Sequence, residues 1–359
     1  MDGIDVACIR TDGLNQVIRG ANGFYPYSAK FRKLLVQALE DAKVVKNRDD
    51  RPGALQDAEE AIDKLHCDAV RDFLIQNNMQ ASDVDVIGYH GQTVLHRPDE
   101  ALTIQLGQGQ ALADELGINV VSDMRAQDMS YGGQGAPLVP VYHQALAASL
   151  PSPYDAHSPV VFVNIGGISN VTYVGEELIA FDSGPGNALI DQWVQAHVGI
   201  PYDQGGAIAS EGQVRIDLAE EMLDAPYFAA SLPKSLDRSD FRLPAPDWTT
   251  VEDGARTLAY VCAGAVIKSV DYFPMTPKLW IICGGGRLNP HIMCDLSELA
   301  IQSGSQVVTA DDVGLDGDAM EAEAWGYLAV RSMAKLPLTF PGTTGCKEPV
   351  TGGVFSKAR

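Results

Sequence analysis

Residues 160–174 read VVFVNIGGISNVTYV, a pattern from which the architecture of much of the chain can be predicted. Two runs of apolar and β-branched residues flank Gly166–Gly167, which predicts a strand, a tight turn and a second strand. A GEE turn follows at 175–177, then LIAFDSGPGN, and then a helix from about Ala188 to Ala196. Strands joined by short turns and followed by a helix predict an α/β fold.

The first residues of the chain, MDGIDVACIRTDG at 1–13, resemble the later part of this pattern. Asp2 and Gly3 are typical of a polar turn, and residues 4–9 have the apolar character of the strand that follows it. The strand ahead of the turn in the second half has no counterpart here. The sequence therefore predicts two similar α/β halves, of which the first lacks a strand.

A proline-rich polar stretch, PSPYDAHSP at 151–159, is the best candidate for a linker between the halves. A chain of 359 residues is longer than one hydrophobic core usually supports. We therefore expect an N-terminal α/β domain at 1–150 and a C-terminal α/β domain at 151–359. Apolar residues at helical spacing predict two amphipathic helices in the first domain, at 29–45 and 54–78.

The composition argues against several classes of partner. The formal net charge is −21, from 47 acidic and 26 basic residues, so most of the surface would repel nucleic acid. No stretch approaches the roughly 18 apolar residues of a membrane span, and the N-terminus lacks the pattern of a signal peptide. The six cysteines include no CxxC pair and are expected to be reduced core thiols. We expect a cytoplasmic protein with neither nucleic-acid nor membrane partners.

Glycine-rich turns are the first candidate binding elements. Successive backbone N–H groups in such turns bind anions, so the turns at Gly166–Gly167 and Asp2–Gly3 are candidate phosphate sites, although each alone is better explained as a tight hairpin. A third cluster, Gly284–Gly286, follows a buried strand and precedes Asn289–Pro290, which predict the start of a helix. The cluster fails the GxGxxG pattern and the chain lacks GxxxxGK[ST], so neither a Rossmann fold nor a P-loop is expected.

Asp182 is the candidate general base. It follows the predicted strand ELIAF and precedes SGPGN, so the strand would hold its carboxylate beside a glycine turn, within reach of a hydroxyl or water. The alternative is an aspartate that caps a helix or stabilises a turn, and position alone does not separate these interpretations.

Two further groups carry side chains suited to chemistry. His90 and His96 lack a third metal ligand at suitable spacing, so we expect no metal site there and interpret His90 as facing solvent or substrate. Glu321 follows an acidic loop at the start of a predicted helix, where it could face a cleft or interact with the helix dipole. The acidic loop lacks the residue order of an EF-hand.

Eight segments, in order, resemble the anhydro-N-acetylmuramic acid kinase family of the sugar kinase, actin and Hsp70 superfamily. They are MDGIDVA, IGYHGQTVLHRP, QLGQGQALA, GGQGAPLVPVYHQAL, VNIGGISNVTYV, FDSGPGNALIDQW, ICGGGRLNP and GDAMEAEAWGYLA. The resemblance implies a two-domain, actin-like (ribonuclease H-like) ATPase fold with an interdomain cleft. It also implies that ATP, with Mg²⁺, phosphorylates 1,6-anhydro-N-acetylmuramic acid while water opens the anhydro ring, giving N-acetylmuramic acid 6-phosphate in peptidoglycan recycling.

The resemblance implies a role for each matching residue. Asp182 corresponds to the catalytic aspartate, which would take a proton from the attacking water. Asp2, Gly3, Gly166 and Gly167 correspond to the two phosphate loops. Gly284, Gly285, Gly286 and Asn289 correspond to the adenosine site. Glu321 corresponds to a glutamate on the sugar side of the cleft, and His90, Asp123, Arg125 and Gln134 fall in segments near it.

The expected partner is a small-molecule amino sugar, and a homodimer is left open by the sequence. Two other functions are compatible with the pattern: a related kinase that acts on another sugar or small acid, and a catalytically inactive nucleotide-binding module. Sugar-dependent release of ADP distinguishes the kinases from the inactive module, and a requirement for the anhydro bond distinguishes the two kinases.

One departure from the family concerns the first phosphate loop. The family reads like GLMSGTSMDGIDVA, whereas this sequence starts at MDGIDVA. We predict that a form extended upstream by a GLMSGTS-like segment is more stable and far more active, because the segment supplies strand pairing and backbone donors to ATP phosphates. Thermal melts and a coupled ADP assay on both forms test this. Equal melting temperature and equal turnover would contradict it.

Overall fold

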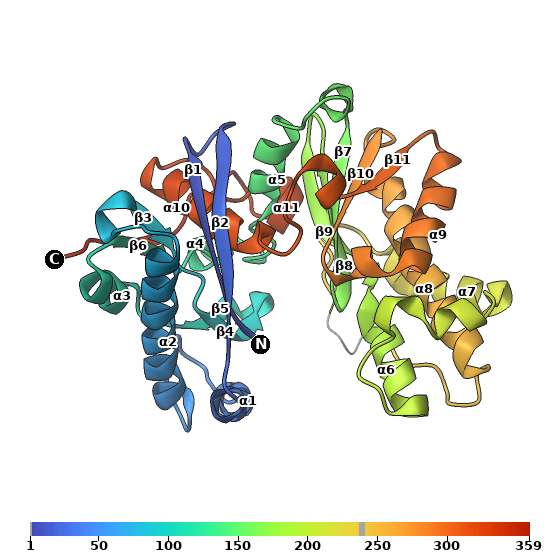
Figure 1. Ribbon diagram of the computed structural model, residues 1–359, viewed down its shortest axis with the longest axis horizontal. Coiled ribbons are helices and arrows are strands. Elements are labelled where there is room, and N and C mark those ends of the chain that lie inside the picture. Colours follow the sequence, from blue (N-terminus) through green and yellow to red (C-terminus); the bar gives the residue numbers. More distant parts are fainter. Residues whose placement is uncertain (1, 237–240) are drawn as a thin grey trace. The chain divides into compact units, whose positions relative to one another are not determined.

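The computed structural model describes residues 2–236 and 241–359, and both parts of the chain into which it divides have α/β architecture (Figure 1). Unit 1 contains Met1–Ser149 and Ala319–Arg359, and unit 2 contains Leu150–Asp318. The first boundary lies at the predicted linker. The second differs from the expected 151–359 domain, because the last 41 residues, 319–359, belong to unit 1.

Unit 2 is built on one five-stranded sheet in the order β11-β10-β7-β8-β9. Strands β7, β8 and β9 are consecutive and antiparallel, and β10 and β11 are parallel to β7. Three antiparallel strands followed by two parallel ones give the ribonuclease H-like order, and β7 and β8 confirm the predicted strand, turn and strand. The strands are β7 (Val160–Ile165), β8 (Ile168–Val174), β9 (Leu178–Pro185), β10 (Leu279–Cys283) and β11 (Gln306–Thr309).

Helices pack on this sheet through a core that includes Trp193 and Trp280. Helix α8 was not predicted, and it lies against α6 at Gly254, where an added Cβ would be 2.3 Å from the Trp193 indole. The Trp193 Nε1–H also donates to the Val251 carbonyl at 2.9 Å. The helices are α6 (Asn187–Val198), α7 (Ile216–Leu223), α8 (Val251–Lys268) and α9 (Pro290–Ile301).

In its described residues, unit 1 contains three small sheets. Strands β1 (Gly3–Thr11) and β2 (Val17–Pro26) form an antiparallel hairpin. A second sheet has the order β12-β6-β3, with β3 parallel and β12 antiparallel to β6. Another hairpin joins β4 to β5. These strands are β3 (Val86–Gly88), β4 (Gln92–Arg97), β5 (Leu102–Leu106), β6 (Asn119–Ser122) and β12 (Val354–Ser356).

The C-terminal segment joins unit 1 through α10 and β12. Helix α10 packs on β1 and β3, and β12 pairs with β6. The approach of α10 is so close that a Cβ on Gly88 would be 1.9 Å from the Trp325 carbonyl oxygen. Sequence order alone could not predict this return of the chain to its first half. The helices are α1 (Ala29–Ala42), α2 (Leu55–Gln76), α3 (Gly109–Leu116), α4 (Ala126–Ser130), α5 (Pro140–Ala147), α10 (Met320–Met333) and α11 (Pro341–Thr344).

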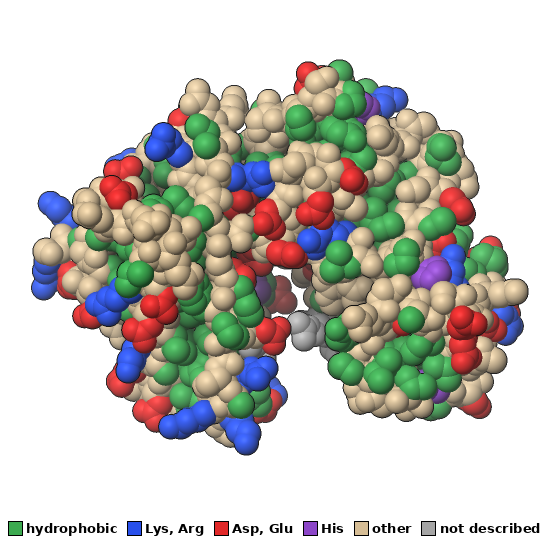
Figure 2. Space-filling model, viewed as in Figure 1, with side chains coloured by type: hydrophobic (Ala, Val, Ile, Leu, Met, Phe, Trp, Pro, Cys, Tyr) green, Lys and Arg blue, Asp and Glu red, His purple; other side chains and the backbone are tan. Residues whose placement is uncertain are grey.

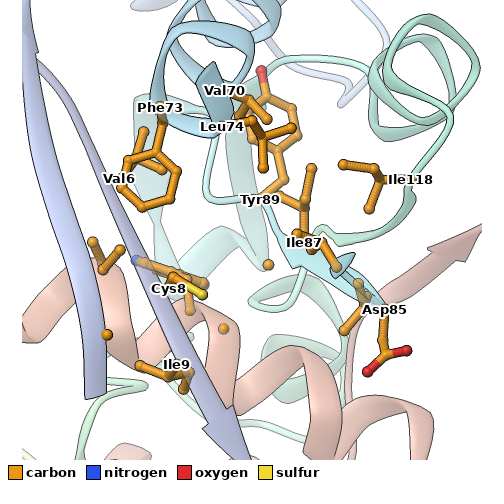
Figure 3. Close-up of a pocket in the computed structure, with 18 of the residues that line it drawn as sticks. Val6, Cys8, Ile9, Val70, Phe73, Leu74, Asp85, Ile87, Tyr89 and Ile118 are labelled. Atoms are coloured by element: carbon orange, nitrogen blue, oxygen red, sulfur yellow. The ribbon is translucent and has the colours of Figure 1, made fainter. Parts of the chain in front are cut away.

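A cavity of about 740 Å³ lies between β1 and β3, with α2 and α10 contributing to its walls (Figure 3). Within the described residues, β1 pairs only with β2, and β3 pairs only with β6. In unit 2 the corresponding position, between β8 and β10, is held by β7. The labelled wall residues are mostly apolar: Val6, Cys8, Ile9, Val70, Phe73, Leu74, Asp85, Ile87, Tyr89 and Ile118.

The surface carries both signs of charge. On the face seen in Figure 2, Asp and Glu side chains are interspersed with Lys, Arg and hydrophobic side chains. Of the helices in the described residues, none has the length and apolar character needed to cross a bilayer.

A buried ion pair joins α8 to α9. Arg256 Nη1 and Nη2 donate to the two carboxylate oxygens of Asp295 at 2.6 and 2.7 Å, and the side chains are only 17% and 4% exposed. We predict that Asp295→Ala lowers the free energy of unfolding by about 3–5 kcal/mol, because the guanidinium is left buried without its partner. Asp217→Ala, which breaks the exposed pair with Arg215, should cost far less, because solvent screens that pair. Urea unfolding compares the variants, and equal losses would contradict the prediction.

Candidate active site

Asp182 lies within β9, on the strand itself. Strand β9 continues to Pro185, and Gly186 is the N-cap of α6, so Asp182 is neither a turn residue nor a helix cap. Across the sheet it pairs with Asn170, which pairs with Asn164. Paired residues on neighbouring strands project to the same face. The sheet therefore presents a row of three polar side chains, one from each antiparallel strand.

The carboxyl group of Asp182 is half-buried, and this burial raises its pKa to about 6. The Leu236 N–H donates to Asp182 Oδ2 at 2.8 Å and opposes the shift, because it stabilises the carboxylate. A carboxyl group with this pKa is ionised at neutral pH and still basic enough to accept a proton. These are the properties of a general base near its operating pH.

The Gly166–Gly167 turn joins β7 to β8 and is fixed to the start of α6. The Asn187 N–H donates to the Gly166 carbonyl at 2.8 Å, and the Gly186 N–H donates to the Gly167 carbonyl at 3.0 Å. An added Cβ on Gly166 would meet no atom nearer than the Ile168 carbonyl oxygen, at 3.6 Å. The turn is thus held by α6, and a Cβ at Gly166 would make only an ordinary van der Waals contact.

The third glycine cluster lies beside that turn. An added Cβ would be 2.3 Å from Asn164 Oδ1 at Gly284 and 2.2 Å from the Ile165 side chain at Gly286, so both positions require glycine. At Gly285 the nearest atom would be 3.9 Å away. The carboxyl ends of the parallel neighbours β7 and β10 therefore bring the two glycine segments together, an edge at which α/β sheets commonly bind ligands.

Asn289 begins α9, as predicted. Its Oδ1 accepts hydrogen bonds from the N–H groups of His291, at 3.0 Å, and Ile292, at 3.4 Å. The side chain is buried and acts as the N-cap of the helix. These two hydrogen bonds occupy the side-chain oxygen of Asn289. A contact between Asn289 and adenosine stays a prediction.

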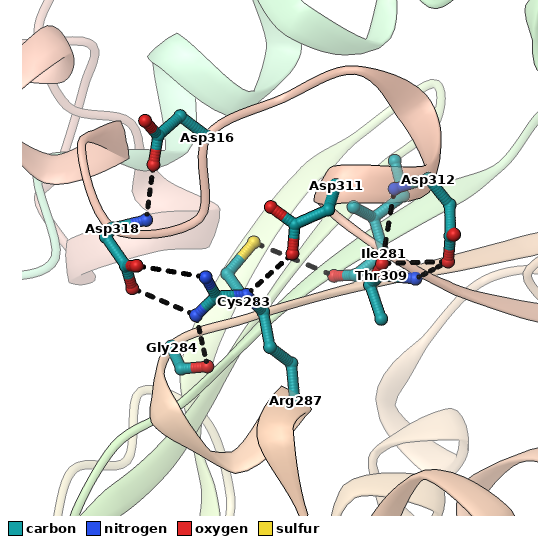
Figure 4. Close-up of polar contacts among 9 residues, drawn as sticks. All are labelled: Ile281, Cys283, Gly284, Arg287, Thr309, Asp311, Asp312, Asp316 and Asp318. Carbon is teal, nitrogen blue, oxygen red and sulfur yellow. Dashed lines mark hydrogen bonds and ion pairs between the residues drawn. The ribbon is translucent and has the colours of Figure 1, made fainter.

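Arg287 ties the glycine cluster to the acidic loop at 311–318 (Figure 4). Its guanidinium binds both carboxylate oxygens of Asp318, at 2.9 and 3.0 Å, and contacts Asp311 at 2.9 Å. Nη1 also donates to the Gly284 carbonyl at 3.0 Å. The pKa of Arg287 is raised, mainly by its hydrogen bonds to Asp318. The acidic residues of this loop thus hold the backbone of the glycine cluster in place.

In unit 1, His90 and Arg125 lie together against Trp325. Arg125 Nη2 is 3.2 Å from His90 Nε2, and the His90 and Trp325 rings are 4.5 Å apart. Burial, with a contribution from Arg125, lowers the pKa of His90 to about 3. The imidazole is therefore neutral and accepts the Arg125 hydrogen bond. Burial lowers the pKa of Arg125. The charge of Glu321, which is exposed at the start of α10, opposes this effect.

Two buried polar atoms beside His90 have no hydrogen-bond partner within the described residues. They are Arg125 Nε and Gln105 Oε1. The rest of each group is fixed, since Arg125 Nη1 donates to the Gly135 carbonyl at 2.9 Å and Gln105 Nε2 to the His90 carbonyl at 2.8 Å. One unpaired donor and one unpaired acceptor are a costly arrangement unless a polar ligand satisfies them.

Asp123 lies at the margin of this group. It has a φ of +53° and an ion pair with Arg48 at 2.6 Å. Both residues line a cavity of about 370 Å³ together with His90 and Gln105. A left-handed conformation at a non-glycine residue often marks a functional position.

Three predicted residues of unit 1 are not joined to this group by any contact that we observe in the described chain. The Gln134 N–H donates to the Thr344 carbonyl at 2.9 Å, and the neighbouring Gly135 contacts Arg125. The Asp2 carbonyl accepts from the Tyr27 N–H at 2.8 Å. Gly3 packs tightly, because an added Cβ would be 2.4 Å from the Tyr25 carbonyl oxygen.

Asn164, Gln105 and Trp325 are not predicted as site residues from the sequence. Asn164 gives a recognisable signal, since it is the one polar residue in the apolar run VVFVNI. Gln105 and Trp325 give none, because each is an ordinary residue of a strand or a helix until the fold brings it to His90.

Comparison with known proteins identifies the family of this chain. A family model described as anhydro-N-acetylmuramic acid kinase matches residues 1–358. The chain belongs to this family. Anhydro-N-acetylmuramic acid kinases from Agrobacterium fabrum, Brucella abortus (strain 2308) and Rhizobium etli are each 54% identical to it. The alignments cover 100%, 99% and 99% of this chain and 96%, 95% and 95% of those relatives. As a member of a kinase family, the chain is an enzyme that transfers a phosphoryl group.

Solved structures give a weaker match. A ROK family glucokinase from Streptomyces griseus in complex with glucose and AMPPNP is 13% identical, with a TM-score of 0.39, over 91% of this chain and 96% of its own. An activator of 2-hydroxyisocaproyl-CoA dehydratase from Clostridium difficile with bound ADPNP is 10% identical, with a TM-score of 0.35. The match covers 64% of this chain and 73% of the activator. The fold class of this kinase family member therefore rests on its own strand order.

Burial lowers the pKa of three histidines in unit 1: His66 to about 4, His90 to about 3 and His143 to about 3. The unfolded chain binds these protons below about pH 6.5, whereas the folded chain does not until about pH 3 to 4. We predict that these groups reduce the free energy of unfolding as the pH falls from 6.5, and contribute nothing above pH 7.

NMR titration tests the protonation directly, since the three imidazoles should remain neutral down to pH 5. In urea unfolding, His143→Gln should lose less stability between pH 7 and pH 5 than the wild type does. Imidazole signals that titrate near pH 6.5 would contradict the prediction.

Proposed function

We propose that this chain converts 1,6-anhydro-N-acetylmuramic acid, ATP and water to N-acetylmuramic acid 6-phosphate and ADP during recycling of peptidoglycan. The observation that carries this proposal is the half-buried carboxyl group of Asp182, fixed on β9 with a pKa raised to about 6, in a chain of this kinase family. Because ATP is the phosphate donor, we place the reaction in the cytoplasm.

In the proposed mechanism Asp182 acts as the general base. Its carboxylate accepts a proton from water, and the water oxygen forms a bond to C1 of the sugar. The bond between C1 and O6 breaks, and its electron pair remains on O6. O6 then attacks the γ-phosphorus, and the bond to the β-phosphate oxygen breaks to release ADP. A single carboxylate is sufficient, because ring opening generates the nucleophile for phosphoryl transfer.

The glycine segments of unit 2 are proposed to bind the nucleotide. A Cβ added at Gly166 or Gly285 would lie 3.6 or 3.9 Å from its nearest neighbour, so phosphate oxygens or a flat base could approach the backbone there. Arg287 supports this role indirectly, because it holds the Gly284 carbonyl and pairs its own charge with Asp311 and Asp318. Mg²⁺ enters as part of the nucleotide substrate and offsets charge on the phosphates.

The His90 group of unit 1 is proposed to recognise the sugar. The unpaired Nε–H of Arg125 suits a carboxylate or carbonyl oxygen, and the unpaired Oε1 of Gln105 suits a hydroxyl or amide N–H. Anhydro-N-acetylmuramic acid carries groups of both kinds. The flat indole of Trp325, beneath His90 and Arg125, limits how these side chains can rotate.

We predict that Asp182→Asn lowers kcat by about a hundred- to ten-thousandfold, because the amide cannot accept the proton from water. ATP affinity should remain near normal, as measured by calorimetry with a non-hydrolysable analogue. The wild-type kcat should fall on the acid side of about pH 6, where Asp182 becomes protonated. Turnover is measured as sugar-dependent ADP release.

Asp217→Asn, an exposed substitution in the same unit, is the control and should leave kcat unchanged. Full turnover by Asp182→Asn would remove Asp182 from the mechanism. ADP release that does not depend on the anhydro sugar would instead favour a kinase for another substrate.

A further inference from the structure

We propose that Lys234 is a positioning residue: its ammonium group, enclosed by three aromatic rings, fixes residues 227–236 against β9 and so keeps Asp182 in its buried setting. This inference rests on the role of Asp182 in the proposed function. We call residues 227–236 the Lys234 strap.

The Lys234 strap touches Asp182 at three places. The Asp182 N–H donates to the Lys234 carbonyl at 3.4 Å, and the Leu236 N–H donates to Asp182 Oδ2 at 2.8 Å. The Tyr227 hydroxyl donates to the Asp182 carbonyl. Since β9 is the edge strand of its sheet, the strap covers the edge on which Asp182 lies. The backbone and the carboxylate of one residue are thus held by the same segment.

The Lys234 side chain anchors this segment from the other direction. Its Nζ lies 4.0 Å from the centre of the Tyr272 ring, 4.6 Å from that of Tyr227 and 5.1 Å from that of Phe181. The residue is only 8% exposed, and Nζ donates to the Tyr227 carbonyl at 3.4 Å. An ammonium held among ring faces in this way is attracted to each ring, and the attraction is stronger where the ammonium is desolvated.

The three rings belong to different parts of unit 2. Phe181 precedes Asp182 on β9, Tyr227 belongs to the strap, and Tyr272 ends the short helix η7 (Ser269–Tyr272). The Tyr272 hydroxyl also donates to the carbonyls of Phe228 and Ala230, at 2.5 and 2.9 Å. Lys234 therefore joins β9, the strap and η7 at one point, and release of its side chain would loosen all three contacts with Asp182.

The charged and titratable groups around this point leave burial as the main influence on Asp182. The strap contributes Lys234 and Tyr227, and η7 contributes Asp271 and Tyr272. From α8, Lys268 lies 5.8 Å from the Phe228 ring of the strap. Burial lowers the pKa of Lys234 to about 8, opposed by Asp271. For Asp182 the first cause is burial and the second is the Leu236 N–H. Loosening the strap should therefore lower the pKa of Asp182, because regained hydration outweighs the lost hydrogen bond.

The test is Lys234→Met, which keeps most of the length of the side chain and removes its charge. ¹³C NMR titration of labelled aspartate, with the Asp182 signal assigned by its loss in Asp182→Asn, reports the pKa without using activity. We expect the pKa of Asp182 to fall from about 6 by about one unit or more, toward the usual value near 4. We also expect kcat to fall about ten- to a hundredfold, with its acid limb shifted to lower pH.

Two substitutions provide the matched comparisons. Lys268→Met removes an exposed ammonium that lies 5.8 Å from the Phe228 ring, and should change neither the pKa nor kcat. Lys234→Arg keeps a cation in the ring enclosure, so the pKa of Asp182 should remain close to its wild-type value of about 6. If Lys234→Met does not fold, Tyr227→Phe keeps the ring, deletes the hydrogen bond to the Asp182 carbonyl, and should also lower the pKa.

The outcomes separate this inference from the proposed function. An unchanged Asp182 pKa in Lys234→Met, or an equal shift in Lys268→Met, would overturn the positioning role. A lowered pKa without a matching shift of the acid limb would retain the positioning role and show that Asp182 is not the base that limits kcat.

Discussion

The double pairing of β7, with β8 on one edge and β10 on the other, is the constraint on which unit 2 depends. Because β7 and β10 run parallel, their carboxyl ends bring the Gly166–Gly167 turn and the Gly284–Gly286 cluster to one edge. Because β7, β8 and β9 are antiparallel, the same register places Asn164, Asn170 and Asp182 in a row. One strand therefore fixes both the proposed nucleotide site and the distance from it to the base.

Unit 1 depends on the close approach of α10 to β3. Gly88 has no side chain, so α10 can lie against β3 and bring Trp325 beneath His90. Arg125 contacts both His90 and the Gly135 carbonyl. The cost of this packing is a donor on Arg125 and an acceptor on Gln105 that the described protein leaves unpaired, and a polar substrate would satisfy both.

Burial adjusts the two halves of the proposed chemistry in complementary ways. At Asp182 it raises the pKa to about 6, which keeps the carboxylate basic at neutral pH. At His90 it lowers the pKa to about 3, which keeps the imidazole neutral and able to accept a hydrogen bond from Arg125. Both shifts follow from the same penalty on charge in a poorly hydrated site, and only the sign of the charged form differs.

The sequence by itself determined the α/β class, the strand, turn and strand at 160–174 and the helix start at Asn289, because these depend on local alternation and turn residues. It also made Asp182 the candidate base, through a segment that resembles the kinase family. Tertiary structure alone decided that residues 319–359 return to unit 1, that Trp325 and Gln105 join His90, and that Lys234 lies beside Asp182. These contacts join residues far apart in the chain. Strand pairing and close packing create them, and neither leaves a periodic signal in the sequence.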